Sequence, residues 1–156
     1  MSINYITGDV TKPCGNGIKI IVHVVNNIGK WGRGFVLSLS KRWKEPEIQY
    51  RQWFNNKKSV DFLLGSIQLV QVEPDIFVAN MIAQYDIYHI NDIPPIRYSA
   101  IRSCLEKVRE FAQQQAASIH APRFGAGLAG GDWHTIELII NEELIQHGIS
   151  VTVYDL

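Results

Sequence analysis

The sequence lacks a net charge, a long apolar run and an N-terminal targeting signal. Lysine and arginine together number 15, as do aspartate and glutamate, so no overall field attracts the protein to nucleic acid or to an anionic membrane. No apolar run is long enough to span a bilayer, and the N-terminus has no basic region followed by an apolar stretch. We therefore expect a cytoplasmic protein with no membrane partner and no general nucleic-acid binding.

Cysteine and the common nucleotide motifs are also scarce. Cys14 and Cys104 are too few and too isolated for a disulfide framework or a zinc site. No glycine turn ends in Gly-Lys-Ser/Thr, and no acidic residue stands at the distance expected for the ribose clamp of a dinucleotide fold. These absences exclude the two standard nucleotide sites. We expect no metal and no other cofactor, and the oligomeric state stays open.

Strand-like apolar runs alternate with helical periodicity along the whole chain, which predicts one α/β domain over residues 1–156 in three layers. The expected strands are Ile3–Ile6, Lys19–Val25, Ser66–Val72, Ile76–Ile82, Ser118–Arg123 and Ile149–Tyr154, and the expected helices are Gly34–Trp43, Pro46–Asn55, Pro95–Gln115 and Trp133–Gln146. Pro94 and Pro95 are expected to start the third helix. Lys57 and Lys58 mark a loop, and Glu73-Pro74-Asp75 predicts an antiparallel hairpin, so the sheet is mixed.

Two glycine-rich turns are the most informative segments that the chain does contain. Residues 29–34 (GKWGRG) and 125–131 (GAGLAGG) each follow an apolar strand and lead into an amphipathic helix. Glycine lets backbone N–H groups approach a ligand closely, and a helix N-terminus adds partial positive charge, so both turns suit a phosphate. The alternative is that the glycines serve only the turn geometry.

Four segments in this order resemble the macro domain, a module that binds ADP-ribose: Gly8-Asp9-Val10, residues 23–36 (HVVNNIGKWGRGFV), residues 122–133 (PRFGAGLAGGDW) and Val151–Tyr154. The similarity is greatest to the small members that act as terminal ADP-ribose protein glycohydrolases or as ADP-ribose 1''-phosphate phosphatases. The resemblance implies a mixed, mostly parallel six-stranded sheet between helices. It also implies a cleft in which ADP-ribose, or an ADP-ribosylated substrate, lies with its diphosphate between the two glycine turns.

The resemblance assigns binding residues along this cleft. Asp9 would accept a hydrogen bond from the adenine amine and Val10 would add a backbone contact, although Gly-Asp pairs also make turns. Tyr154 would close over the adenine or pack in the core, and Asn26 and Asn27 would surround the distal ribose or form a turn. The residues around the diphosphate would be Trp31, Gly32, Arg33, Gly34 and Phe35 from the first turn, and Arg123, Phe124, Gly125, Ala126, Gly127, Leu128, Ala129 and Gly130 from the second.

The catalytic residues of the glycohydrolase-like members are absent here. Those members use a lysine after the fourth strand and an aspartate in the second glycine turn, whereas this chain has no lysine between Ile82 and Pro94 and has Ala129 at the second position. Activated water would then have to attack. The candidate bases are Asp132, which also suits a helix N-cap, His23, which also suits a satisfied core position, and Asp86.

Three functions follow from these residues. The first is hydrolysis at the distal ribose of ADP-ribose, where the bond joins an acyl group, a phosphate or a protein side chain. The second is a binding module that recognises ADP-ribose and does no chemistry. The third is binding of another phosphate-bearing ligand, such as a nucleic-acid end. A base within reach of the distal ribose would separate the first function from the second.

Overall fold

The computed structural model describes residues 1–56 and 58–156. Its strands are β1 (Asn4–Thr7), β2 (Lys19–Asn26), β3 (Ile67–Glu73), β4 (Ile76–Gln84), β5 (Ser118–Ala121) and β6 (Val151–Asp155). Its helices are α1 (Phe35–Arg42), α2 (Glu45–Asn55), α3 (Tyr98–Gln115) and α4 (Trp133–Glu143), and a short 3-10 turn, η1 (Ile145–His147), follows α4. The predicted loop at Lys57 lies outside the described residues.

The six strands form one mixed sheet in the order β1-β6-β5-β2-β4-β3. Every neighbouring pair is parallel except β3 and β4, which form the antiparallel hairpin expected at Glu73–Asp75. The α/β class and the mostly parallel sheet are therefore confirmed. Because β2, β4, β5, β6 and β1 run the same way, their carboxyl ends meet at one edge, where ligands of such sheets bind.

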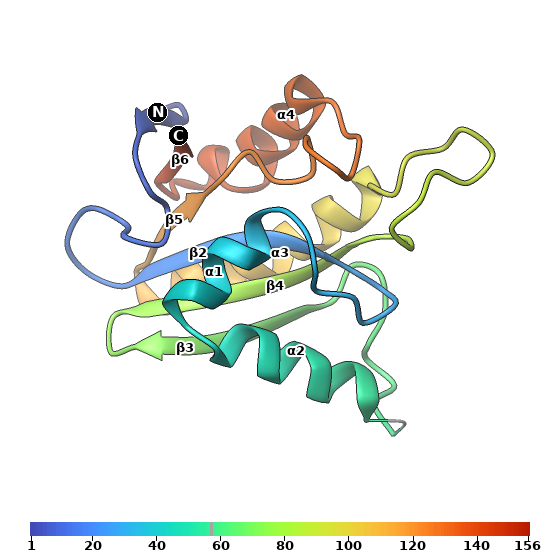
Figure 1. Ribbon diagram of the computed structural model, residues 1–156. Helices are drawn as coiled ribbons and strands as arrows, with labels where there is room; N and C mark the ends of the chain where they lie inside the picture. The colour runs from blue at the N-terminus through green and yellow to red at the C-terminus, as the bar shows by residue number, and fades with distance from the viewer. Residues whose placement is uncertain (57) are drawn as a thin grey trace.

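Helices cover both faces of the sheet and enclose two cores (Figure 1). On one face, α1 and α2 bury Leu39, Tyr50 and Trp53 against β2 and β4. On the other face, α3 and α4 bury a larger set that includes Leu105 and Ile140. The nearly continuous apolar run of β2 follows from this arrangement, since its residues contribute to both cores.

Several predicted boundaries are wrong, and the backbone hydrogen-bonding capacity of nearby residues explains two of them. The third helix begins at Tyr98 and not at Pro95. The preceding residues are extended because Pro95 O accepts from Tyr85 N at 2.8 Å and Ile96 N donates to Ala129 O at 3.1 Å. The fifth strand stops at Ala121 because Pro122 has no N–H for a further ladder bond.

The last predicted helix is also shorter than expected. It ends at Glu143, and η1 continues the chain to Gly148, which has a positive φ of 79°. That conformation favours glycine and turns the chain into β6. Within residues 1–56 and 58–156, no helix has both the length and the apolar character needed to cross a membrane.

Candidate functional site

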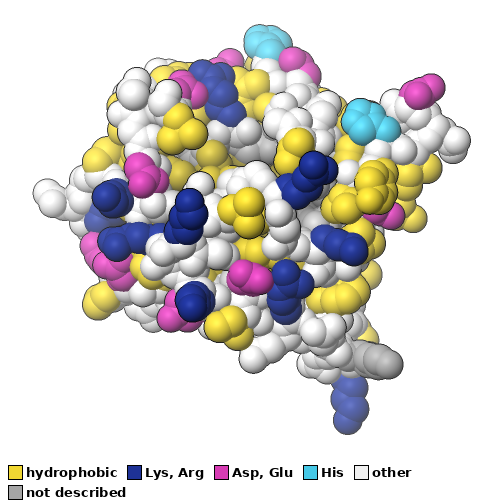
Figure 2. Space-filling view, viewed as in Figure 1, with side chains coloured by type: hydrophobic (Ala, Val, Ile, Leu, Met, Phe, Trp, Pro, Cys, Tyr) yellow, Lys and Arg dark blue, Asp and Glu magenta, His cyan; other side chains and the backbone are white. Residues whose placement is uncertain are grey.

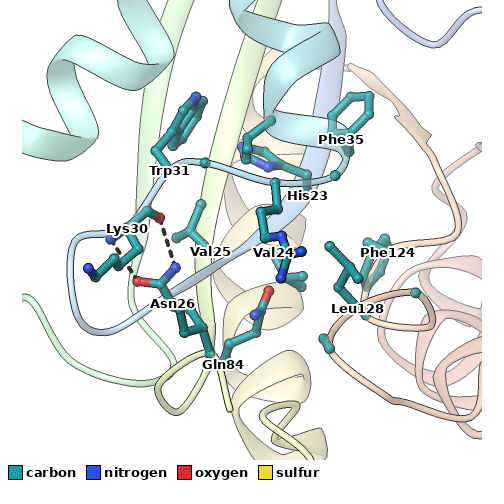
Figure 3. Close-up of a pocket in the computed structure, with 18 of the residues that line it drawn as sticks. His23, Val24, Val25, Asn26, Lys30, Trp31, Phe35, Gln84, Phe124 and Leu128 are labelled. Atoms are coloured by element: carbon teal, nitrogen blue, oxygen red, sulfur yellow. Dashed lines mark hydrogen bonds between the residues drawn. The ribbon is translucent and has the colours of Figure 1, made fainter.

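A cavity of about 630 Å³ opens at the carboxyl edge of the sheet, between the loop that follows β2 and the loop that follows β5. We call residues 29–34 loop 1 and residues 122–131 loop 2. Figure 3 shows Trp31 and Phe35 on one side of the cavity and Phe124 and Leu128, from loop 2, on another. The predicted site residues that line the cavity are His23, Asn26, Trp31, Gly32, Arg33, Gly34, Phe35, Arg123, Phe124, Gly125, Gly127, Leu128 and Ala129.

Asn26 at the end of β2 fixes the start of loop 1. Its Nδ2 donates to Lys30 O at 2.8 Å, and its Oδ1 accepts from Lys30 N at 3.0 Å and from Ile28 N at 3.1 Å (Figure 3). The buried hydroxyl of Tyr50 donates to the same Oδ1 at 2.9 Å and to Asn26 O at 2.6 Å. Most of the amide is thus engaged with loop 1, so the geometry assigns Asn26 to positioning the loop.

Helix α2 also holds loop 1 from below. Arg51 donates to Gly29 O at 3.3 Å and to Trp31 O at 3.5 Å, and it pairs with Glu47 at 3.0 Å. The indole of Trp31 donates to Ser40 Oγ at 2.8 Å. The two bonds from Arg51 thus engage the carbonyl groups of Gly29 and Trp31 in loop 1.

Beyond Lys30, the backbone N–H groups of loop 1 have no hydrogen-bond partner in the described structure. Among the described residues, no hydrogen bond uses the backbone N–H groups of residues 31–36. Gly34 is the N-cap of α1 with φ 79° and has no side chain to cap the helix. Free N–H groups and an uncapped helix start are the features that an anion site at this turn would use, and the predicted phosphate contact stays a prediction.

Two glycines of loop 2 are closely packed, whereas in loop 1 Gly29 is packed against Phe54 and Gly32 and Gly34 have room around them. A Cβ on Gly125 would lie 2.9 Å from Ile96 Cδ1, and one on Gly131 would lie 2.5 Å from the backbone oxygen of Gly125. Gly127, in contrast, faces open space. The N–H groups of residues 127–129 have no hydrogen-bond partner within the described residues, so three successive donors are available to an anion.

The start of α4 confirms the N-cap alternative given for Asp132, and this cap occupies the helix end that the glycine turn was expected to offer to a phosphate. Asp132 is its N-cap, and its Oδ2 accepts from Thr135 N at 3.2 Å and from Thr135 Oγ1 at 2.8 Å. These hydrogen bonds lower the pKa of the Asp132 carboxyl. Loop 2 therefore offers backbone donors without an open helix end, and Asp132 does not line the cavity.

His23 lies beneath loop 1 and is almost fully buried. Its Nε2 is 2.5 Å from Asn80 Oδ1, and its ring packs edge-on against Trp31 and Phe35. Burial lowers the pKa of His23 to about 4, so the imidazole is neutral at pH 7. Its Nδ1 is buried without a hydrogen-bond partner in the described structure.

Four cationic side chains line the cavity: Lys30, Arg33, Arg51 and Arg123. No carboxylate lines it within the described residues. Arg51 and Arg123 pair with carboxylates outside the lining, whereas Lys30 and Arg33 form no ion pair in the described part of the chain. Figure 2 shows Lys and Arg side chains spread over the face that carries α1. A neutral protein thus concentrates positive charge at one cavity.

Several predicted residues do not line the cavity. Tyr154 is buried, and its hydroxyl lies 2.7 Å from His120 Nδ1 and 3.0 Å from Cys14 N. This position favours the packing alternative for Tyr154. Val10 also packs in the core, beside α1 and α2.

The other predicted residues outside the lining belong to loops. Asn27 Oδ1 accepts from Asp86 N at 2.8 Å and so ties together the loops after β2 and β4. Asp9 is exposed, and its Oδ1 accepts from Thr11 N and Oγ1 at 2.9 and 2.7 Å. Ala126 and Gly130 form the turns of loop 2, where Ala126 N donates to Arg123 O and Gly130 N to Gly127 O.

The sequence predicted no ligand contact for the remaining lining residues: Val24, Val25, Lys30, Val36, Arg51, Gln84, Ile87, Tyr88 and Pro122. Gln84 carried a usable signal, since it ends a buried strand beside Asn26 (Figure 3). Arg51 carried none, because its role depends on how α2 packs under loop 1. Tyr88 comes from the loop between β4 and α3, whose path depends on positive φ values at Asp86, Asn91 and Asp92.

Comparison with solved structures gives close matches. A protein of unknown function from Bacteroides thetaiotaomicron is 54% identical, with a TM-score of 0.97 over 100% of this chain and 99% of that one. A macrodomain protein from Streptomyces coelicolor is 46% identical, with a TM-score of 0.88 over 99% of each chain. The DarTG protein of Thermosipho africanus, solved in complex with ADP-ribose, shares the fold at 15% identity, with a TM-score of 0.78 over 98% of this chain and 41% of that one.

Comparison with curated proteins gives a similar picture. The chromodomain-helicase-DNA-binding protein 1-like of Danio rerio is 33% identical over 98% of this chain, which spans only 15% of the length of that relative. The ADP-ribose 1''-phosphate phosphatase of Candida albicans is 24% identical over 90% of this chain and 92% of its own length. No family model matches the chain. The match to the Streptomyces macrodomain protein, at 46% identity over 99% of both chains, shows that this chain belongs to the macrodomain family.

Proposed function

We propose that this protein binds ADP-ribose, with the diphosphate between loop 1 and loop 2. One observation carries the proposal: two loops with free backbone N–H groups line a cavity that has four cationic side chains and no carboxylate among its described residues. Backbone donors and a helix N-terminus recognise phosphate oxygens in many proteins. The proximity of the loops supports a diphosphate that contacts both, since a Cβ on Gly34 would lie 3.6 Å from Leu128 Cδ1.

The size and walls of the cavity support a ligand larger than a phosphate. A volume of about 630 Å³ falls in the range of sites for nucleotide-sized molecules. Trp31, Phe35, Phe124 and Leu128 supply apolar walls to the same cavity. Such walls suit the sugar and base carbons of ADP-ribose, while the loops suit its charge.

The relatives support the same ligand. The Thermosipho DarTG structure contains ADP-ribose, and the Candida relative is named for a substrate built on ADP-ribose. The zebrafish relative is much longer than this chain. Its activity as a whole protein lends no support to the proposal, which concerns only the macrodomain.

Hydrolysis at the distal ribose is the second candidate function, and the similarity to the Candida phosphatase favours it. Among the described lining residues the only titratable group that can act as a base at neutral pH without first losing a proton is the imidazole of His23. Its free Nδ1 is shielded from solvent, so a substrate or water would reach it only after loop 1 moved. Asp132 and Asp86, the other predicted bases, lie outside the lining.

Titration calorimetry with ADP-ribose, AMP and ribose 5-phosphate tests the binding proposal. ADP-ribose should bind most tightly, because only a diphosphate contacts both loops. Equal affinity for AMP would contradict the two-loop arrangement. Product analysis of ADP-ribose 1''-phosphate, an O-acyl-ADP-ribose and a mono-ADP-ribosylated protein, on the same sample, then tests hydrolysis.

A further inference from the structure

Arg123, the first residue after Pro122 in loop 2, is held in a fixed and flat orientation. Its Nε donates to Asp155 Oδ1 at 2.7 Å and its Nη2 donates to Asp155 Oδ2 at 3.0 Å. Two parallel bonds to one carboxylate fix the plane of a guanidinium as well as its position. The pairing with Asp155 also raises the pKa of Arg123 above its ordinary value, so the group stays charged.

Two aromatic rings lie against this guanidinium. The Arg123 Cζ atom is 5.0 Å from the ring centroid of Tyr5 and 5.5 Å from that of Trp133. The rings are themselves fixed, since Trp133 Nε1 donates to the Tyr5 hydroxyl at 3.0 Å and that hydroxyl donates to Glu137. The Arg123 side chain nevertheless stays 44% exposed and lines the cavity. Its remaining surface is therefore available to a ligand.

The surroundings of Arg123 match the predicted adenine position. Thr7 is paired with Asp155 in the sheet, and Gly8 N donates to Asp155 O at 2.8 Å. The next residue is Asp9, the predicted acceptor for the adenine amine. Asp9 Oδ1 is bonded to Thr11, whereas no hydrogen bond uses Oδ2 in the described part of the chain. The Asp9 carboxylate and the planar Arg123 guanidinium thus follow the carboxyl ends of β1 and β5, the two strands that flank β6 in the sheet.

The side chain expected to cover the base is not available. Tyr154 directs its hydroxyl to His120 and is buried beneath Gly8, where its Cδ2 would be 3.5 Å from an added Cβ. We infer that Arg123 is the platform on which adenine stacks, with Asp9 receiving the amine at the edge of the base. This inference rests on the proposed binding of ADP-ribose. It adds base recognition by a guanidinium in place of the expected aromatic ring.

Stacking explains why the site would select a purine. A guanidinium is planar and weakly hydrated, and it stacks on π faces in a way that a lysine ammonium cannot. A purine presents a larger face than a pyrimidine, so the preference for adenine over uracil should depend on Arg123. The two aromatic rings and Asp155 set this geometry before the ligand arrives, which limits the entropy lost on binding.

The test compares Arg123→Lys with the wild-type protein, using ADP-ribose, ADP, UDP and inorganic pyrophosphate as titrants. The lysine variant keeps the positive charge and loses the planar guanidinium group. We expect its affinity for ADP-ribose and ADP to fall by about 5- to 30-fold, its affinity for pyrophosphate to change less than about twofold, and the ADP over UDP preference to shrink. Arg33→Lys is the matched control from loop 1, and its effect should be similar for all four ligands.

Three results would overturn the inference. One is an unchanged ADP-ribose affinity in Arg123→Lys, and another is an equal loss for pyrophosphate and ADP, which would make Arg123 a phosphate ligand. The third is a wild-type protein that binds none of the titrants, in which case the proposed function fails as well. Arg123→Gln, with the melting temperature measured for both variants, separates lost stacking from lost folding, because Gln removes the charge but is readily tolerated at an exposed position.

Discussion

Loop 1 and loop 2 share a glycine-rich sequence but reach their conformations in different ways. Loop 1 is held by side chains outside it, from Asn26, Tyr50 and Arg51, and its glycines at positions 32 and 34 face open space or the cavity. Loop 2 is held by its own packing: Gly125 and Gly131 lie against each other, against Ile96 in the segment before α3, and against Ile136 of α4. Glycine is therefore used at positions 32 and 34 of loop 1 where the backbone is accessible, and at positions 125 and 131 of loop 2 where the backbone is closely packed.

The helices that follow these loops differ in whether a side chain caps their first N–H groups. Helix α1 begins at Gly34, which has no side chain to satisfy the first N–H groups. Helix α4 begins at Asp132, whose carboxylate fills that position. A ligand anion is expected to interact with the dipole of α1 and not with that of α4. Substitutions matched between the two loops can test each part of this contrast.

The largest effect is expected within loop 2. Gly131→Ala would place a Cβ 2.5 Å from Gly125 O, and we expect the free energy of unfolding to fall by about 3 kcal/mol because the backbone must shift. Chemical denaturation measures this change. Gly127→Ala is the matched control, since a Cβ there meets nothing within 4 Å, and its stability should change by less than about 1 kcal/mol.

Gly127→Ala also separates packing from binding. If the N–H groups of residues 127–129 hold a phosphate, the added methyl group should weaken ADP-ribose several-fold in a protein of normal stability. A stable Gly127→Ala protein with full affinity would place the ligand away from loop 2.

Glycine substitutions in loop 1 are expected to lower the free energy of unfolding less than Gly131→Ala does. Gly34 has φ 79° at the N-cap of α1, so Gly34→Ala should lower the free energy of unfolding by about 1–2 kcal/mol through backbone strain. Gly32 has ordinary φ and open space, so Gly32→Ala should fold normally. Both variants should bind ADP-ribose more weakly when measured by calorimetry. Normal binding by Gly32→Ala would show that loop 1 does not contact the ligand at this position.

The support beneath loop 1 can be removed without touching the cavity lining. Tyr50→Phe deletes the hydroxyl that bonds Asn26 Oδ1 and O, and we expect a loss of about 1 kcal/mol in the free energy of unfolding. ADP-ribose affinity should fall a few-fold, because the loop is less well fixed. Trp53 packs in the same core from the same helix. Trp53→Phe therefore serves as a control that should lower stability and leave affinity unchanged.

The sequence was sufficient for the sheet, the two loops and much of the cavity lining, because buried strands and glycine turns have strong local signatures. It could not resolve positions whose role depends on a contact far along the chain. Arg51 supports loop 1 from α2, and Tyr154 is directed away from the cavity by His120. Neither contact has a local pattern. The early end of the fifth strand was a missed local signal, since Pro122 stands there in the sequence.

The smallest effect is expected at Asp132, where the two readings of the residue differ most clearly. If Asp132 is a helix N-cap, the Asp132→Asn variant should be as stable as the wild-type protein, because asparagine keeps an acceptor. The melting temperature of Asp132→Ala should be slightly lower than that of the wild-type protein. The pKa of Asp132 is lowered in the folded state by its bonds to Thr135. Its contribution to stability is therefore present above the ordinary aspartate pKa and is lost as pH falls through the lower, folded value.

Melting temperatures of the wild-type protein and Asp132→Ala, measured from pH 7 down to pH 2, should accordingly converge at the acid end. ADP-ribose affinity should be the same in both variants, since Asp132 does not line the cavity.

If the protein proves to hydrolyse an ADP-ribose derivative, turnover should survive in Asp132→Asn, because a carboxylate engaged at the start of α4 is not positioned to activate water. Loss of turnover in both Asp132→Asn and Asp132→Ala, with normal ADP-ribose affinity, would instead identify Asp132 as the base. Loop 2 would then be the catalytic side of the cavity and loop 1 its binding side.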